Sequence, residues 1–371
     1  MAGRNMFGML LTNFQDSFTP ALVTQRTFSS IPFGAKYRLI DFPLSNMVNS
    51  GITKIGVVTK NNYLSLMDHI GSGKAYNLSR RRGGLSFLPP SDNTGDKYNN
   101  FVMTIDAISN FIKNSYEDYV LISGSMNVVN MDYQQMLNAH LKSGADVTIC
   151  YRNMPLNKLS GEKIVFSLDS NHRVSEVLIN PRTVDSGSCM VNTAIMKKEL
   201  LLDFVSDCLS RSRFDFARDV VQSGVKHYKV YGYEVKGYYA QVDTLQSYFE
   251  ANMDLLKPEV RAELFDMRNP IYTKVRDDMP TKYGLNSSVK NSLISPGCVI
   301  EGEVENSVIF KGVHISKGAK ISNCIIMQDC IIGADTTLNY VICDKDCVIT
   351  PKKMLCGIDS YPVCISKKSI V

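Results

Sequence analysis

Residues 314–348 form the stretch HISKGAKISNCIIMQDCIIGADTTLNYVICDKDCV, which decides the fold of the C-terminal part of the chain. Apolar side chains recur there at steps of six residues, and glycines and small or polar residues fill the spaces between them. The steps run from Ile315 to Ile321, from Ile326 through Ile332 to Leu338, and from Ile342 to Val348, whereas Val304, Val308 and Val313 fall outside the register. This period predicts a triangular parallel β-helix, because stacked six-residue segments would bury one continuous apolar column.

The chain before residue 258 has a different pattern, in which short apolar runs alternate with amphipathic segments. The runs are rich in β-branched residues and predict buried strands, and the segments between them predict helices. We expect strands at 6–11, 55–59, 119–123 and 146–151, and helices at 104–112, 132–141 and 245–256. Strand–helix alternation predicts an α/β domain with a mostly parallel sheet. The expected division is an α/β domain over 1–258, a polar connector over 259–284 and the β-helix over 285–371.

Composition excludes several classes of protein. The 371 residues are 44% hydrophobic and 21% charged, which is typical of a globular protein and not of a disordered chain. No membrane-spanning run or signal peptide is evident, so we expect no membrane partner and a cytoplasmic location. The ten cysteines lack zinc-site spacing, which indicates reduced thiols and no metal. The densest basic cluster, Arg80 to Arg82, has no interleaved aromatic residues, so we expect a solvated loop and no nucleic-acid partner.

Five segments connect this pair of domains to a known family. They are PFGAKYRLIDFPLSN (32–46), NSGI (49–52), HIGSGK (69–74), LPP (88–90) and EANMDL (250–255). Together they resemble the corresponding segments of ADP-glucose pyrophosphorylases (glucose-1-phosphate adenylyltransferases), and the resemblance runs along the whole chain. It implies a Rossmann-like nucleotidyltransferase domain followed by a left-handed parallel β-helix.

The phosphate-binding motifs of that family are altered here. In the family, the first strand leads into a loop of the form LAGGxGxRL, whose glycines let backbone N–H groups approach a triphosphate. This chain has LTNFQDSFT at 11–19, which places Asn13, Phe14 and Asp16 at glycine positions and Phe18 at the arginine position. The family motif RAKP is RTFS at 26–29, so Phe28 replaces a catalytic lysine.

The metal and sugar-phosphate motifs are altered as well. The family's metal-binding aspartates correspond to Ser125 in SGS (123–125) and to Gln241 in QVDT (241–244). Asp243, at an expected glycine position, is the candidate substitute ligand. The family's Glu-Lys-Pro motif at the sugar phosphate is Ile179-Asn180-Pro181. Losing one preorganised charge costs about 10²–10³ in rate, so these changes together predict little turnover.

The resemblance is therefore to the glycogen biosynthesis regulatory subunits of the family, in which the active site is degenerate. It implies a hetero-oligomer, expected to be a heterotetramer, in which this chain modulates a catalytic paralogue. Mg²⁺ and ATP would belong to that catalytic partner, and this chain would hold no cofactor of its own.

Two arginines are candidate ligands for a sugar-phosphate effector. In the family, basic residues of the RAKP and FGGKYR segments help to bind such effectors, and Arg26 and Arg38 retain the charge at those positions. The alternative for Arg38 is an ion pair with Asp41 or another acid.

Two other functions remain open from the sequence. An active nucleotidyltransferase would use Asp243 or Asp16 to hold magnesium. A β-helix acyltransferase would use His314, the only histidine of the β-helix, as a general base, although a surface or rung position is the favoured interpretation of that residue.

Overall fold

The computed structural model describes residues 5–12, 20–59, 62–89, 100–214, 218 and 221–371. Its N-terminal part is built around a nine-stranded sheet with the order β10-β9-β11-β6-β1-β4-β5, to which β8 and β12 are added through β11. The strands are β1 (Met6–Leu11), β4 (Lys54–Val58), β5 (Gly84–Leu88), β6 (Tyr119–Gly124), β8 (Val147–Pro155), β9 (Ile164–Leu168), β10 (Val174–Ile179), β11 (Ser186–Lys197) and β12 (Val230–Glu234). The sheet is mixed and not mostly parallel as expected, because β11 runs antiparallel to β6, β8 and β9.

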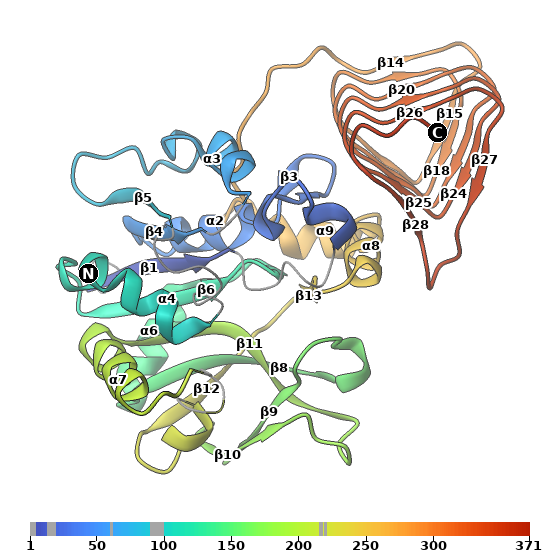
Figure 1. Cartoon of the computed structure of the whole chain (residues 1–371). Helices are drawn as coiled ribbons and strands as arrows, with labels where there is room; N and C mark the ends of the chain where they lie inside the picture. Colours follow the sequence, from blue (N-terminus) through green and yellow to red (C-terminus); the bar gives the residue numbers. More distant parts are fainter. Residues whose placement is uncertain (1–4, 13–19, 60–61, 90–99, 215–217, 219–220) are drawn as a thin grey trace.

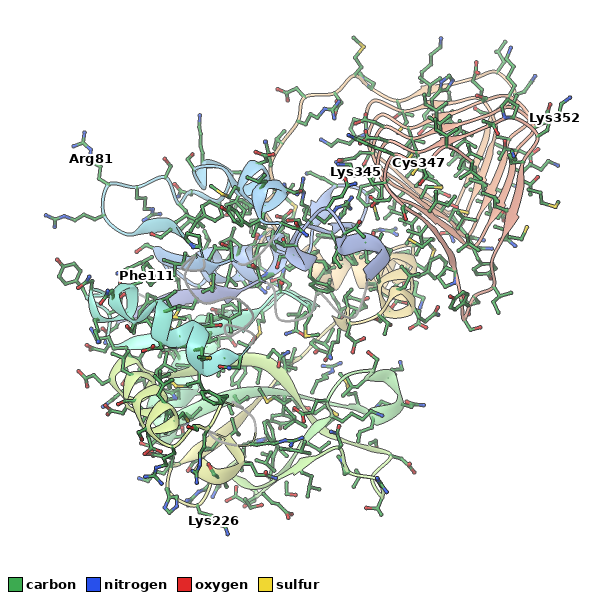
Figure 2. All side chains as sticks on the ribbon, in the orientation of Figure 1. Arg81, Phe111, Lys226, Lys345, Cys347 and Lys352 are labelled. Atoms are coloured by element: carbon green, nitrogen blue, oxygen red, sulfur yellow. The ribbon has the colours of Figure 1, made fainter. Side chains whose placement is uncertain are left out.

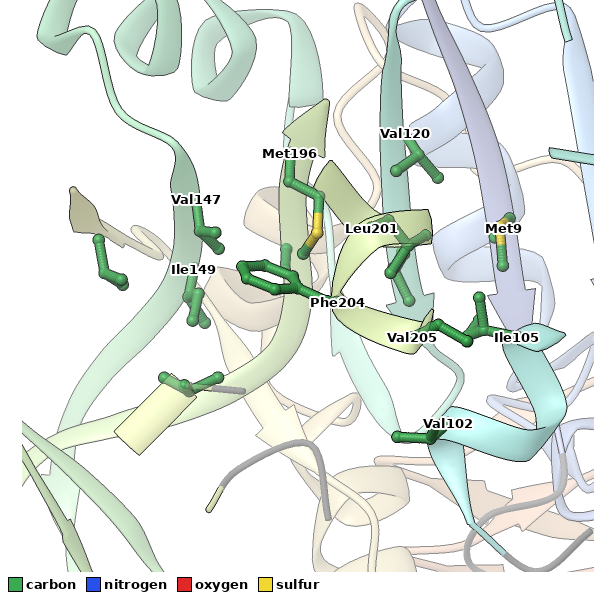
Figure 3. Close-up of a cluster of buried hydrophobic side chains, with 14 of the residues drawn as sticks. Met9, Val102, Ile105, Val120, Val147, Ile149, Met196, Leu201, Phe204 and Val205 are labelled. Carbon is green, nitrogen blue, oxygen red and sulfur yellow. The ribbon is translucent and has the colours of Figure 1, made fainter. Parts of the chain in front are cut away.

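Helices cover both faces of this sheet (Figure 1). One face carries α4 (Phe101–Ala107), α5 (Ser109–Lys113) and α7 (Lys198–Ser210), and the other carries α2 (Asp41–Asn49), α3 (Leu64–Ile70) and α6 (Tyr133–Ser143). Figure 3 shows the first of these cores, where Phe204 and Leu201 of α7 and Ile105 of α4 pack on the strand residues Val120 and Ile149. The helix expected at 104–112 is two helices, because the backbone leaves the helical region at Ile108.

The C-terminal part is a triangular parallel β-helix, which stands beside the sheet domain in Figure 1. Its three five-stranded sheets have the orders β14-β17-β20-β23-β26, β15-β18-β21-β24-β27 and β16-β19-β22-β25-β28. The strands run from β14 (Lys282–Tyr283) to β28 (Val363–Ile365), so the first strand lies within the expected connector. The pairing of His314 with Ile331 and of Ile331 with Val348 sets a rung of 17 residues.

The 17-residue rung explains the irregular register of the sequence. It is one residue shorter than three hexapeptides, so the inward positions shift once in every turn of the β-helix. Val304, Val308 and Val313 are therefore buried despite their spacing. The same shift corrects one expectation at the last rung: Ile349 occupies the apolar column, and Val348 is only partly buried.

A third apolar cluster joins the two parts of the chain. It combines Phe28 of the short helix η2 (Phe28–Ser30) and Phe249 of α8 (Leu245–Asp254) with Phe310, Met327 and Ile342 of the β-helix. The connector holds α9 (Pro258–Leu264) and then crosses the α2 and α3 side of the sheet domain, where Lys274 Nζ donates to the carbonyl of Asp68 at 2.7 Å. The two parts therefore share a core and are not merely tethered.

Candidate functional site

The first altered position, Ser125, is closed into the core. It follows β6, and its Oγ lies 2.5 Å from Ser29 Oγ, which in turn donates to the carbonyl of Thr12 at 2.8 Å. Ser125 and Ser29 are completely buried. A hydroxyl held in this way supplies neither the charge nor the free lone pairs that magnesium requires.

The second altered position, Gln241, ends the short strand β13 (Tyr239–Gln241), which pairs with β7 (Asn127–Val129). The Tyr239 hydroxyl donates to Asn127 Oδ1 at 3.0 Å and to Gln241 Oε1 at 3.1 Å. Burial raises the pKa of Tyr239, and the nearby Asp243 carboxylate adds to this rise. Gln241 is thus part of a neutral hydrogen-bond network.

Asp243, the candidate substitute ligand, is bound within the start of α8. Its Oδ1 accepts a hydrogen bond from Ser247 Oγ at 3.1 Å, and its Oδ2 accepts from the Ser160 backbone N–H at 3.2 Å and from Gln241 Nε2 at 3.3 Å. It is 1% exposed and directly precedes Thr244, the N-cap of the helix. The carboxylate therefore stabilises a helix N-terminus, where a negative charge is favourable.

Magnesium does not fit the described part of this site. Ser125 and Gln241 are neutral, and Asp243 is a single carboxylate with both oxygens already accepting hydrogen bonds. Among the described residues, no group of three or more His, Cys, Asp or Glu side chains is placed to hold a metal ion. Asn13, Phe14, Asp16 and Phe18 lie outside the described residues, so their part in the site stays a prediction.

The remaining altered positions are structural in their placement. Phe28, where the family has a lysine, is completely buried in the apolar cluster between the two domains. Ile179 packs on the core at the end of β10. Asn180 has a φ of 50°, and its Oδ1 accepts a hydrogen bond from the Lys163 backbone N–H at 2.8 Å. His314 is a rung residue, with Nε2 3.9 Å from Glu301 Oε2.

The candidate effector residue Arg26 forms a buried ion pair between the domains. Its Nη2 donates to both carboxylate oxygens of Asp344 in the β-helix, at 2.7 and 2.8 Å. Arg26 is 4% exposed and Asp344 1%. Arg26 is thus committed to a partner that sequence reasoning missed.

Arg38 is held beside this pair. Its Nη1 donates to the carbonyl and the hydroxyl of Ser65 at 2.8 and 2.9 Å, and its backbone N–H donates to Asp41 Oδ2. The Asp41 carboxylate also binds His69 and Tyr76, each at 2.6 Å. Burial lowers the pKa of His69, although the hydrogen-bonded Asp41 opposes this shift.

A third cation, Lys345, completes the group, and Figure 2 shows it on the side of the β-helix that faces the sheet domain. Burial lowers its pKa to about 7, and repulsion by Arg38 and Arg26 adds to the effect. The available signal in the sequence was the polar pair Asp344-Lys345 between apolar rung positions. Three cations from two domains therefore meet here. Arg80 to Arg82, by contrast, are exposed, and Figure 2 places Arg81 at the far edge of the molecule.

Comparison with known proteins agrees with this architecture. The family model of nucleotidyl transferases matches residues 22–258, and that of the GlmU-like C-terminal hexapeptide matches residues 278–361. The chain belongs to the nucleotidyl transferase family, and within it to the glucose-1-phosphate adenylyltransferase family. The chain is 34% identical to the glycogen biosynthesis protein GlgD of Bacillus subtilis, covering 99% of this chain and 97% of that protein. It is also 34% identical to the glucose-1-phosphate adenylyltransferases of Clostridium perfringens (100% and 98% covered) and Geobacillus stearothermophilus (97% and 94%).

None of the helices in the described part of the chain is long and apolar enough to cross a membrane.

Proposed function

We propose that this chain is a regulatory subunit of glucose-1-phosphate adenylyltransferase in glycogen synthesis, with little or no turnover of its own. One observation carries the proposal: the two positions of metal-binding carboxylates hold Ser125 and Gln241, and both are committed to internal hydrogen bonds. Without a bound cation to neutralise a polyphosphate, adenylyl transfer loses its main electrostatic stabilisation.

The proposed regulatory input is an anionic sugar phosphate bound near Arg38 and Lys345. A phosphate group would relieve the repulsion between these cations, favour the protonated form of Lys345 and connect the two domains. Arg26 has a different role in this proposal, because its guanidinium already holds Asp344. Arg26 would then set the distance between the domains while Arg38 and Lys345 bind the effector.

The test is ADP-glucose formation from ATP, glucose 1-phosphate and Mg²⁺ by the purified chain, alone and mixed with the catalytic paralogue from the same organism. We expect no turnover alone and, in the mixture, a raised rate or a shifted effector response. Lys345→Met should reduce the effector response of the mixture, while Lys352→Met, on the outer side of the β-helix (Figure 2), should not. Full turnover by the chain alone would contradict the proposal.

The runner-up function is an active adenylyltransferase with altered ligands. It is favoured by the adenylyltransferase relatives, which are as similar to the chain as the GlgD relative is. In that case the chain alone would turn over, and Asp243→Asn would abolish the activity.

We also propose that the β-helix contacts the catalytic subunit. Met354, Ile358 and Tyr361 are 74%, 62% and 76% exposed near its C-terminal end, which is unusual for apolar side chains of this size. Tyr361→Lys should weaken assembly in size-exclusion chromatography, whereas Tyr116→Lys on the sheet domain should not. This comparison is sharper than deleting residues 285–371, because the deletion would expose the apolar cluster shared by the two domains.

A further inference from the structure

A groove of about 680 Å³ lies in the sheet domain along the strand β12. One wall is the C-terminal end of α6 with Lys142 and Ser143, the other is the turn 170–172, and the floor is β12. None of the altered catalytic positions lines it. Its volume is within the range of about 300–1,000 Å³ that is typical of sites for small molecules.

Two tyrosines form the floor of the groove. Tyr231 and Tyr233 are alternate residues of β12, so their side chains lie on the same face of the strand. Both are half-buried, and Tyr233 packs on the core beneath α6, which fixes its ring. The turn holds the backbone of the strand from the other side, because the Gly232 N–H donates to the carbonyl of His172 at 2.8 Å. The groove therefore offers two aromatic surfaces on a rigid support.

The rim is polar and carries both signs of charge. Ser143, Ser170 and Asn171 supply hydroxyl and amide groups, and Lys142, Lys236 and Glu234 supply charges. Glu234 Oε1 accepts a hydrogen bond from Asn153 Nδ2 at 3.1 Å, which orients that carboxylate. Such a rim can donate to and accept from a ligand that has many hydroxyl groups.

The electrostatics of the groove argue against a phosphate ligand. The end of α6 that forms its wall is the C-terminal end, where Gly144 is the C-cap, and a helix C-terminus carries a negative partial charge. The Glu234 carboxylate adds a negative charge. A neutral sugar is free of this penalty, since its C–H face can pack on a tyrosine ring while its hydroxyls bind the rim.

We propose that the β12 groove binds a neutral α-linked glucose chain, so that the subunit is held at the polymer whose synthesis it serves. This inference rests on the proposed role in glycogen synthesis, which supplies the identity of the sugar. Tyr231 is the stacking residue, and the rim hydroxyls and amides read the glucose hydroxyls.

The test is native gel electrophoresis of the full chain with and without glycogen in the gel, followed by titration with maltoheptaose. We expect glycogen to retard the wild-type chain and Tyr231→Phe, which keeps the ring. Tyr231→Ala should bind about tenfold more weakly, the equivalent of one lost stacking contact. Tyr116→Ala, a substitution of a 97% exposed tyrosine elsewhere on the domain, is the matched control and should bind as wild type does.

Two results would overturn the inference: no retardation of the wild-type chain, or retardation that Tyr231→Ala leaves unchanged. Displacement from glycogen by inorganic phosphate but not by maltoheptaose would likewise assign the groove to anions. The experiment uses this chain alone, so it is independent of the rate assay with the catalytic paralogue. Normal regulation without glucan binding would reject the groove only, and glucan binding without regulation would reject the proposed function only.

Discussion

Asp344→Ala should destabilise the protein strongly, because it would leave the Arg26 guanidinium buried without its counter-ion. Arg26 is 4% exposed, and its contact with Met327 Sδ at 3.9 Å cannot replace a carboxylate. Removing one partner of a buried ion pair costs about 3–5 kcal/mol. We expect a value in the upper half of that range, since Lys345 and Arg38 add positive charge around the same point.

The assay is guanidinium unfolding of the full chain, followed by far-UV circular dichroism because the sequence contains no tryptophan. The double variant Arg26→Met with Asp344→Ala removes both charges and should recover a large part of the loss. Arg268→Ala is the control, because its ion pair with Asp266 is on the surface and Arg268 is 88% exposed. Exposed pairs contribute about 0–1 kcal/mol. A loss below about 1 kcal/mol for Asp344→Ala, or a double variant no better than the single one, would refute the reasoning.

Three further predictions concern Lys345, Gly302 and Asp243. The pKa of Lys345 is lowered from 10.5 to about 7, so between those pH values the unfolded chain binds the extra proton and the free energy of unfolding should rise with pH. Lys345→Met should flatten this rise in unfolding curves at pH 7, 8 and 9, and a difference independent of pH would contradict the assignment. In Gly302→Ala the new Cβ would clash with the carbonyls of Ala319 and Ser316, which belong to the next rung, so we expect a loss of about 1–3 kcal/mol. Gly224→Ala, whose nearest neighbour would be a side-chain atom at 3.4 Å, should cost less, and equal losses would show that the rungs adjust freely. Asp243→Asn should cost about 1 kcal/mol through the start of α8 and leave Mg²⁺ affinity in a calorimetric titration unchanged, whereas a loss of Mg²⁺ binding would restore Asp243 as a ligand.

The local elements of this fold were predictable from the sequence. The strand at 6–11 is found at those residues, and the helix expected at 132–141 is α6, with Asp132 accepting a hydrogen bond from the Gln134 N–H and Gly144 ending the helix in the left-handed region. Both signals are short-range, since a cap or an apolar run acts within a few residues. The sixfold period likewise predicted the β-helix, and only the 17-residue rung shifted its inward positions.

The contacts between the domains could not be predicted in the same way. Arg26 and Asp344 are 318 positions apart in the chain, so no local pattern relates them. The sequence showed a retained arginine and therefore indicated an effector ligand, whereas the structure gives that arginine an internal partner. Lys345 was missed for the same reason: its unusual pKa arises from Arg38 and Arg26, which only the folded chain brings close.

Helix α8 is the one element that belongs to both halves of the molecule. Its first turn is fixed by Asp243 and Ser247 beside Gln241, and farther along the helix the Phe249 ring lies 6.0 Å from the Tyr340 ring of the β-helix. A stiff helix anchored at both ends works as a lever. A force applied by a neighbouring subunit to the β-helix would reach the former metal site along a single rod of about three turns, without unfolding anything between them.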